Sequence, residues 1–154
     1  MRATVATRGF TFVEMMVVLA IIGMAAAVAI PAIDAGMDSR EVRRATRQIA
    51  ATMHYMRGEA VATGKMHRMR ISPSRNAIET DDHSRWAVLT DRAIIERIEG
   101  GMASGDDSVD ILFYPNGATS GADVVVASRR DRANNRLRLI LDPLLGTVRV
   151  EDGS

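Results

Sequence analysis

The longest apolar run in the chain extends from Met15 to Ile33 and contains nineteen residues without a formal charge. A helix of this length is about 28 Å long, close to the ~30 Å hydrocarbon thickness of a bilayer. A buried core helix is the alternative, but so long a run without polar side chains is unusual in a small domain. The pattern therefore predicts one transmembrane helix.

A second pattern starts at Ser39, where apolar residues recur every three to four positions, the period of a helix with one buried stripe. The stripe consists of Val42, Ala45, Ile49, Met53, Met56 and Ala60. We expect one helix from about Thr11 to Thr63, ended by Gly64 and bent near Pro31 and Gly36.

Several arginines lie mainly off this stripe. They are Arg40, Arg43, Arg44, Arg47 and Arg57. Such a charge run is usually a solvated helix face; contact with lipid headgroups or with a neighbouring subunit is the alternative.

After Gly64 the chain changes to short segments separated by turn residues. The segments are MHRMRI, NAIET, RWAVL, AIIERI, VDILFY, DVVVA, RLRLIL and TVRV. Alternation of apolar and polar residues in 66–71 and 136–141 predicts half-buried antiparallel strands, whereas 93–98 fits helix or strand. Residues 100–108 read as a flexible loop. The fold class is therefore α+β, a long N-terminal helix packed on a small antiparallel sheet or sandwich.

Composition limits the chemistry of the chain. It has no cysteine, which excludes disulfides and thiolate metal sites. Twenty basic residues face nineteen acidic ones, and if residues 1–9 are a leader, the loss of Arg2 and Arg8 leaves 18 against 19. A nearly neutral mature chain is not a general nucleic-acid binder.

The order Arg8-Gly9-Phe10-Thr11-Phe12-Val13-Glu14, followed by the apolar run and Pro31, resembles the signal of type IV prepilins and pseudopilins. A secretory signal peptide differs, because its cleavage site follows the apolar stretch. The resemblance implies that prepilin peptidase cuts between Gly9 and Phe10 on the cytoplasmic face and N-methylates Phe10.

Glu14 would be the fifth residue of that mature chain. A carboxylate at the edge of an apolar helix costs free energy, so a role for it is expected. The resemblance implies that Glu14 neutralises the terminal ammonium of a neighbouring subunit during assembly. The alternative is a glutamate in the headgroup layer without a partner.

These features divide the chain into a leader (1–9), a transmembrane and assembly helix (10–34), an amphipathic second half of that helix (35–64) and a periplasmic β-rich domain (65–154). The positive-inside rule alone favours the opposite orientation, because more arginines follow the apolar run than precede it. The cleavage motif requires a cytoplasmic N-terminus, and we give it precedence. The expected location is the bacterial inner membrane.

The C-terminal third contains VDILFYPNGATSGADVVV and then RLRLILDPLLGTVRV. Phe113, Pro115, Gly117 and Gly121 resemble the "F-x-P-x-G" strand end of the GspH/FimT pseudopilins, and Arg136 to Leu141, Gly146 and Val148 to Val150 resemble their closing strands. These residues are also common turn formers in any β domain. The turn at residues 142–145 departs from the shorter, more polar one expected there.

Catalytic and metal-binding patterns are not evident in the sequence. His54, His67 and His83 have no ligand spacing, Asp81 to Ser84 contains triad residue types only as sequence neighbours, and the loop around Asp106 and Asp107 lacks the EF-hand repeat. We expect no enzyme activity, no cofactor and no metal.

An arginine-rich stretch from Ser128 to Arg138 carries a local charge of +4. Arg129, Arg130, Arg132 and Arg136 are candidates for binding DNA phosphates. No aromatic residue is interleaved to stack on bases, so a solvated or subunit-facing loop is the favoured interpretation.

The sequence is compatible with two functions. The first is a minor pseudopilin of a type II secretion system, with prepilin peptidase, other major and minor pseudopilins, the inner-membrane assembly platform and secreted cargo as partners. The second is a FimT-like minor type IV pilin that binds DNA for uptake or supports pilus assembly.

Overall fold

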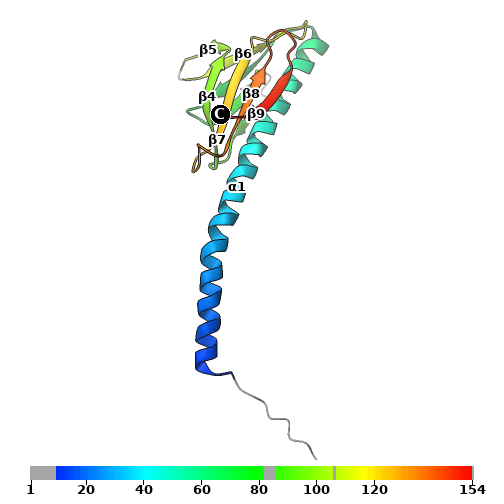
Figure 1. The fold of residues 1–154 in the computed structure, drawn as a ribbon. Coiled ribbons are helices and arrows are strands. Elements are labelled where there is room, and N and C mark those ends of the chain that lie inside the picture. The colour runs from blue at the N-terminus through cyan, green and yellow to red at the C-terminus, as the bar shows by residue number, and fades with distance from the viewer. Residues whose placement is uncertain (1–9, 82–85, 106, 154) are drawn as a thin grey trace, which may run out of the picture. The chain divides into compact units, whose positions relative to one another are not determined.

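The computed structural model describes residues 10–81, 86–105 and 107–153, except for the side chains of residues 28–35 and 86. Figure 1 traces these residues as one long helix, α1 (Phe12–Thr63), followed by short strands. The chain divides into two units, Met1–Gly36 and Met37–Ser154, which are treated separately below.

The first unit consists mainly of the N-terminal part of α1. Thr11 lies just before the helix, and its hydroxyl accepts a hydrogen bond from the backbone N–H of Glu14 at 3.2 Å. This satisfies one of the unpaired donors of the first turn. The helix therefore begins close to its predicted start, at Phe12 rather than Thr11.

In the second unit, the remainder of α1 forms one wall of the hydrophobic core. All six residues of the predicted stripe, from Val42 to Ala60, are at most 4% exposed. Gly64 has a φ of 66°, the left-handed conformation that commonly ends a helix. The predicted stripe and helix end are both confirmed.

Two antiparallel sheets complete the second unit. One has the strand order β3-β2-β1-β6-β5 and the other β4-β7-β8-β9. The strands are β1 (His67–Ser72), β2 (Ala77–Thr80), β3 (Trp86–Val88), β4 (Ala93–Gly100), β5 (Met102–Ala103), β6 (Val109–Phe113), β7 (Ala122–Ser128), β8 (Arg136–Leu141) and β9 (Val148–Asp152). The predicted α+β class is confirmed.

Side chains from α1 and from both sheets form one core cluster. Ile49 and Met53 of α1, Ile71 of β1, Phe113 of β6 and Val124 of β7 belong to it, each at most 1% exposed. Alternate residues of β1 point into the core, which leaves Arg68 and Arg70 on the opposite face. The alternation predicted for this segment is confirmed.

The structure settles one ambiguous segment of the sequence prediction and corrects another segment. Residues 93–98 belong to strand β4, which pairs with β7 through a register shift between Ile95 and Arg97. The predicted flexible loop at 100–108 contains β5, which pairs with β6. Glycine conformations at Gly100 and Gly101, with φ of 80° and 65°, separate β4 from β5.

Candidate assembly surfaces

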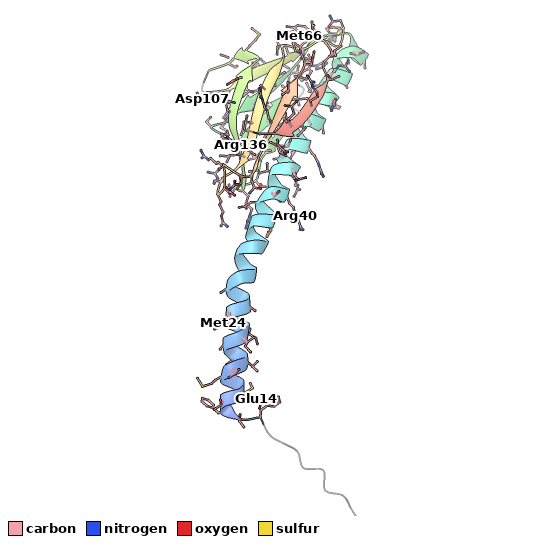
Figure 2. All side chains as sticks on the ribbon, in the orientation of Figure 1. Glu14, Met24, Arg40, Met66, Asp107 and Arg136 are labelled. Carbon is pink, nitrogen blue, oxygen red and sulfur yellow. The ribbon has the colours of Figure 1, made fainter. Side chains whose placement is uncertain are left out.

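The start of α1 presents a carboxylate and a row of apolar side chains. Glu14 is exposed in the first turn, where a negative charge is favoured by the helix dipole. Thr11 and Glu14 have the T-x-x-E spacing of a capping box, a local signal that our sequence interpretation missed. Figure 2 shows Glu14 at this end of the helix. Gly9, the other half of the predicted cleavage site, lies outside the described residues, and Phe10 is 76% exposed.

Large apolar side chains follow on all sides of this helix segment. Phe12 is 79% exposed, Leu19 64% and Met24 73%. Among the side chains of the first unit that the structure describes, the exposed large apolar ones are Phe10, Phe12, Val13, Met15, Met16, Val17, Val18, Leu19, Ile21, Ile22 and Met24. A continuous apolar surface of this kind indicates an interaction site.

In the described part of the chain, no helix meets the combined length and hydropathy requirement for a membrane span. The predicted span from Met15 to Ile33 extends into residues 28–35, whose side chains are not described, and it stays a prediction. The kink predicted at Pro31 and Gly36 also stays a prediction. Pro31 belongs to the same undescribed stretch, and Gly36 is the last residue of the first unit.

Where α1 enters the second unit, it is tied to the β4–β7 side by an ion pair. The carboxylate of Asp38, whose side chain is 6% exposed, accepts a hydrogen bond from Nη1 of Arg92 at 2.9 Å. The carbonyl oxygen of Arg92 in turn accepts the backbone N–H of Arg129 at 2.9 Å. The helix and the arginine-rich stretch are therefore neighbours at this end of the unit.

The connection between β7 and β8, residues 129–135, is here called the arginine loop. Its conformation is set by Asp131, whose carboxylate accepts hydrogen bonds from Nδ2 of Asn134 and of Asn135. The hydroxyl of Ser128 accepts the backbone N–H groups of Arg130 and Asp131, both at 3.2 Å. Such hydrogen bonds from side chains to nearby backbone groups stabilise the conformation of a loop that does not pair with a strand.

The structure does not bring all the predicted DNA-binding arginines together on this loop. Arg129, Arg130 and Arg132 are exposed on it, whereas Arg136 is the half-buried first residue of β8. Arg138 forms a bidentate ion pair with Asp123 of the neighbouring strand β7. The charge available for binding is therefore smaller than the sequence count of +4 implies.

At the opposite end of the unit, Arg57 of α1 joins two glycine turns. Its Nε donates to the carbonyl oxygen of Gly117 at 3.0 Å. A Cβ atom added at Gly146 would lie 2.4 Å from that oxygen and 2.5 Å from Nε of Arg57. Gly117 and Gly146 have φ of 83° and 61°. The "F-x-P-x-G" segment thus has a packing role here, beside the buried Phe113.

The turn at residues 142–145, which departs from the expected pattern, is also held by specific bonds. Oδ1 of Asp142 accepts the backbone N–H groups of Leu144 and Leu145, both at 2.8 Å. These bonds lower the pKa of the Asp142 carboxyl below its ordinary value. The turn leaves the side chains of Leu144 and Leu145 83% and 63% exposed.

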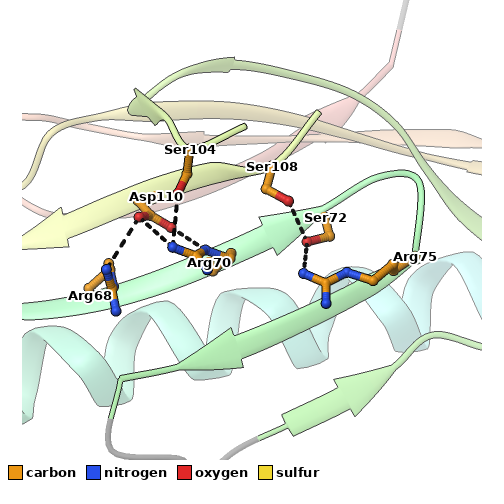
Figure 3. A network of polar contacts seen from close by, with 7 residues as sticks. All are labelled: Arg68, Arg70, Ser72, Arg75, Ser104, Ser108 and Asp110. Carbon is orange, nitrogen blue, oxygen red and sulfur yellow. Dashed lines mark hydrogen bonds and ion pairs between the residues drawn. The ribbon is translucent and has the colours of Figure 1, made fainter. Parts of the chain in front are cut away.

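A polar network on the outer face of the first sheet joins Ser104 and Ser108 to β1 (Figure 3). Arg70 donates to Asp110 through Nε at 2.8 Å and through Nη2 at 3.1 Å, and its Nη2 also donates to Ser104 at 2.8 Å. These hydrogen bonds from Arg70 lower the pKa of the Asp110 carboxyl, while burial acts in the opposite direction. The network is structural, because it joins three strand or turn segments.

The histidines are separate from one another where they are described. Nδ1 of His67 lies 3.3 Å from Oδ1 of Asp81, and His54 is exposed on α1. His83 lies outside the described residues. Among the residues that the structure describes, no group of three or more His, Cys, Asp or Glu is arranged to hold a metal ion.

Comparison with known families gives two matches along the chain. Residues 6–30 match the "Prokaryotic N-terminal methylation motif", and residues 45–144 match "Type II transport protein GspH". The second match covers more than half of the chain. The two matches fall on the segments that carried the two resemblances noted in the sequence.

Individual relatives agree with these matches. The type II secretion system protein H of Xanthomonas campestris pv. campestris is 30% identical over 131 residues, 82% of this chain and 76% of that protein. The minor pseudopilin EpsH of the Vibrio cholerae type 2 secretion system has a TM-score of 0.60 and 12% identity, over 73% of this chain and 97% of that one. The Pseudomonas aeruginosa type IV minor pilin FimU has a TM-score of 0.54 and 11% identity, over 75% and 90% respectively. At such identities the two structures establish a shared fold alone.

Proposed function

Because this chain belongs to the GspH family of type II transport proteins, we propose that it is a minor pseudopilin, a structural subunit of a type II secretion pseudopilus. The observation that carries this proposal is the combination of an exposed apolar helix start bearing Glu14 with a separate, well-packed α+β unit. A subunit that polymerises through its helix needs an apolar helix surface that is free to contact other subunits and a second unit that is stable without that surface.

The proposed mechanism of assembly is mechanical. Prepilin peptidase removes residues 1–9 and methylates Phe10, and the apolar part of α1 then packs against the same segment of other pseudopilins. In that packed core, the Glu14 carboxylate meets the terminal ammonium of a neighbour. The pairing stabilises most where water is excluded, and it offsets the cost of burying either charge alone.

Before assembly, the same helix anchors the subunit in the inner membrane. The N-terminal methylation motif and the protein H relative support an inner-membrane-anchored pilin. We place the N-terminus in the cytoplasm and the second unit in the periplasm. Other pseudopilins are the primary partners, and the inner-membrane assembly platform and secreted cargo are further ones.

The DNA-binding alternative has weaker support. The 30% identical relative is a secretion protein, and the likeness to the pilin FimU concerns the fold only. Arg138 is neutralised by Asp123, and Arg136 is half-buried on β8. The two positions therefore contribute little to a phosphate-binding surface.

The proposal is tested by deleting the gene and measuring type II secretion and natural transformation in the same strain. Loss of secretion, restored by the wild-type chain and not by Glu14→Ala, is the expected result. The variant must reach the membrane at the wild-type level for the comparison to hold. Normal secretion together with lost transformation would contradict the proposal and favour the DNA-uptake alternative.

A further inference from the structure

The end of the second unit where α1 enters it carries a concentration of arginines from two distant parts of the sequence. We define the basic collar as Arg40 and Arg43 of α1 together with Arg129, Arg130 and Arg132 of the arginine loop. All five are exposed. Ser39, Val42 and Arg43 line one small cavity with Asn134, Asn135 and Arg136, which places this turn of α1 beside the arginine loop.

Two carboxylates beside this surface are engaged by the fold. Asp38 is 6% exposed and is bound to Arg92, and Asp131 accepts hydrogen bonds from the side chains of Asn134 and Asn135. Arg44 is left out of the collar because it pairs with Glu41 at 4.0 Å. Asp91, Glu151 and Asp152 are exposed acidic residues near the collar, and Asp152 lines the same cavity as Arg43, so three exposed carboxylates lie beside five arginines. The collar as a whole therefore presents positive charge.

The position of the collar along the chain indicates what it meets. Arg40 follows Ile33, the end of the predicted membrane span, by only seven positions. Seven residues of helix measure about 10 Å, and the headgroup layer of one leaflet is roughly 5–8 Å thick. Charges at that height lie within about one Debye length of the lipid phosphates.

We propose that the basic collar binds the headgroups of anionic phospholipids on the surface of the membrane in which α1 is anchored. The inference rests on the membrane anchoring in the proposed function. Binding there holds the second unit against the membrane before assembly, since an anionic surface attracts juxtamembrane arginines. It also gives a role to arginines that follow the membrane span, on the side of the membrane where the positive-inside rule disfavours basic residues.

Lipid fits the collar better than nucleic acid does. Residues 128–138 include no aromatic side chain to stack on bases. Arg40 and Arg43 of the collar also lie on α1 itself, a few residues after the predicted membrane span, which favours a membrane surface. DNA is treated below as a competing outcome.

The chain contains no cysteine, so a single introduced cysteine can be labelled specifically. A nitroxide label attached to Ala133→Cys lies on the exposed arginine loop. A label attached to Leu144→Cys lies at the far end of the unit, where the native side chain is 83% exposed. The full chain is reconstituted in vesicles of phosphatidylcholine alone or of equal parts phosphatidylcholine and phosphatidylglycerol. Collision of each nitroxide with a water-soluble paramagnetic reagent is then measured.

The collar predicts that phosphatidylglycerol protects the label at position 133 about threefold and leaves the label at 144 accessible. About 1 M salt should abolish the protection, because the Debye length falls to ~3 Å. Replacing Arg129, Arg130 and Arg132 together with Gln should abolish it too. A matched variant with Arg75, Arg97 and Arg149 replaced by Gln loses the same charge elsewhere and should keep it.

Equal accessibility at position 133 in both kinds of vesicle would overturn the inference, as would protection that survives the loop replacements. Protection by duplex DNA but not by phosphatidylglycerol would overturn it in favour of nucleic acid. Carbonate extraction of the same vesicles separates this failure from failure of the proposed function. If the chain stays in the vesicles but the label at position 133 is unprotected, only the lipid-binding role of the collar is contradicted. If carbonate extracts the chain from both kinds of vesicle, the membrane anchoring of the proposed function is contradicted as well.

Discussion

Nε of Arg57 on α1 lies 3.0 Å from the carbonyl oxygen of Gly117, to which it donates a hydrogen bond across sixty positions of sequence. Gly146 approaches the same guanidinium from a second turn. This contact joins the end of the helix to the turn after β6 and to the turn between β8 and β9. It helps to explain why glycine occupies both turns: each has a positive φ, and an added Cβ would lie 2.5 Å from Nε of Arg57 at Gly146 and 3.1 Å from its Nη2 at Gly117.

Gly146→Ala should destabilise the second unit by roughly 3 kcal/mol or more, because the added methyl meets Gly117 and Arg57 and the backbone is left-handed. Gly105→Ala is the matched control. Gly105 has a φ of 71° but nothing within 4 Å of an added Cβ, so only the backbone cost of about 1–2 kcal/mol applies. Urea unfolding of both variants measures the difference. Equal losses would contradict the packing role of Arg57.

The Asp110 carboxylate makes the free energy of unfolding depend on pH in the acidic range. Its pKa is lowered in the folded state, so its contribution is complete above the unfolded pKa of about 3.9 and is lost as pH falls through the folded pKa. Asp110→Asn should flatten this part of the stability curve and cost roughly 2 kcal/mol at neutral pH. Arg70→Gln should reduce the slope in the same region, because the hydrogen bonds that contribute most to the lowered pKa of Asp110 are gone, while Arg68 remains 3.6 Å away. Unfolding free energies between about pH 2 and pH 7 test both variants; a wild-type slope in either would contradict the assignment.

Much of this fold is predictable from local patterns. The stripe from Val42 to Ala60 predicts the buried face of α1, and short β-branched segments predict the strands, because side-chain periodicity is set by local geometry. Residues 93–98 stay ambiguous in sequence because six residues fit either period. Pairing with β7 makes them a strand.

The long-range contacts are not predictable in this way. Arg57 has the pattern of a solvated arginine, and only the fold brings the Gly117 turn to it. Residues 100–108 read as a flexible loop because of their glycines and aspartates, yet Ser104 is bound by Arg70 across thirty-four positions. At the N-terminus, the motif around Gly9 and Glu14 predicts processing and assembly. In the proposed function the partner charge of Glu14 belongs to another subunit, so one subunit cannot display it.

Glu14→Ala should leave insertion of the chain into the membrane intact and should greatly reduce its incorporation into pseudopili. The reason is that a neighbouring ammonium is left unpaired in an apolar core. Glu14→Gln keeps the size of the side chain and should fail similarly, because the charge is what is needed. Crosslinking of subunits in membranes, followed by detection in sheared pseudopili, measures both variants. Wild-type assembly of Glu14→Gln would contradict charge pairing.

Thr11→Ala provides a separate test of how Glu14 is held. Loss of the N-cap should cost about 1 kcal/mol of helix stability in the first turn, whereas Thr11→Ser should retain the cap. Hydrogen exchange of the first-turn amides measures the fraying directly. Equal exchange in Thr11→Ala and Thr11→Ser would contradict capping by the hydroxyl.

The account depends most on an N-terminal helix that is processed at its cytoplasmic side and then becomes the packing core of a polymer. Mass spectrometry of the intact protein, extracted from its native membrane, tests this most directly. We predict a chain that begins at Phe10 and carries one methyl group on its terminal nitrogen. A chain that still begins at Met1, or one that is cut beyond the apolar run, would contradict the account.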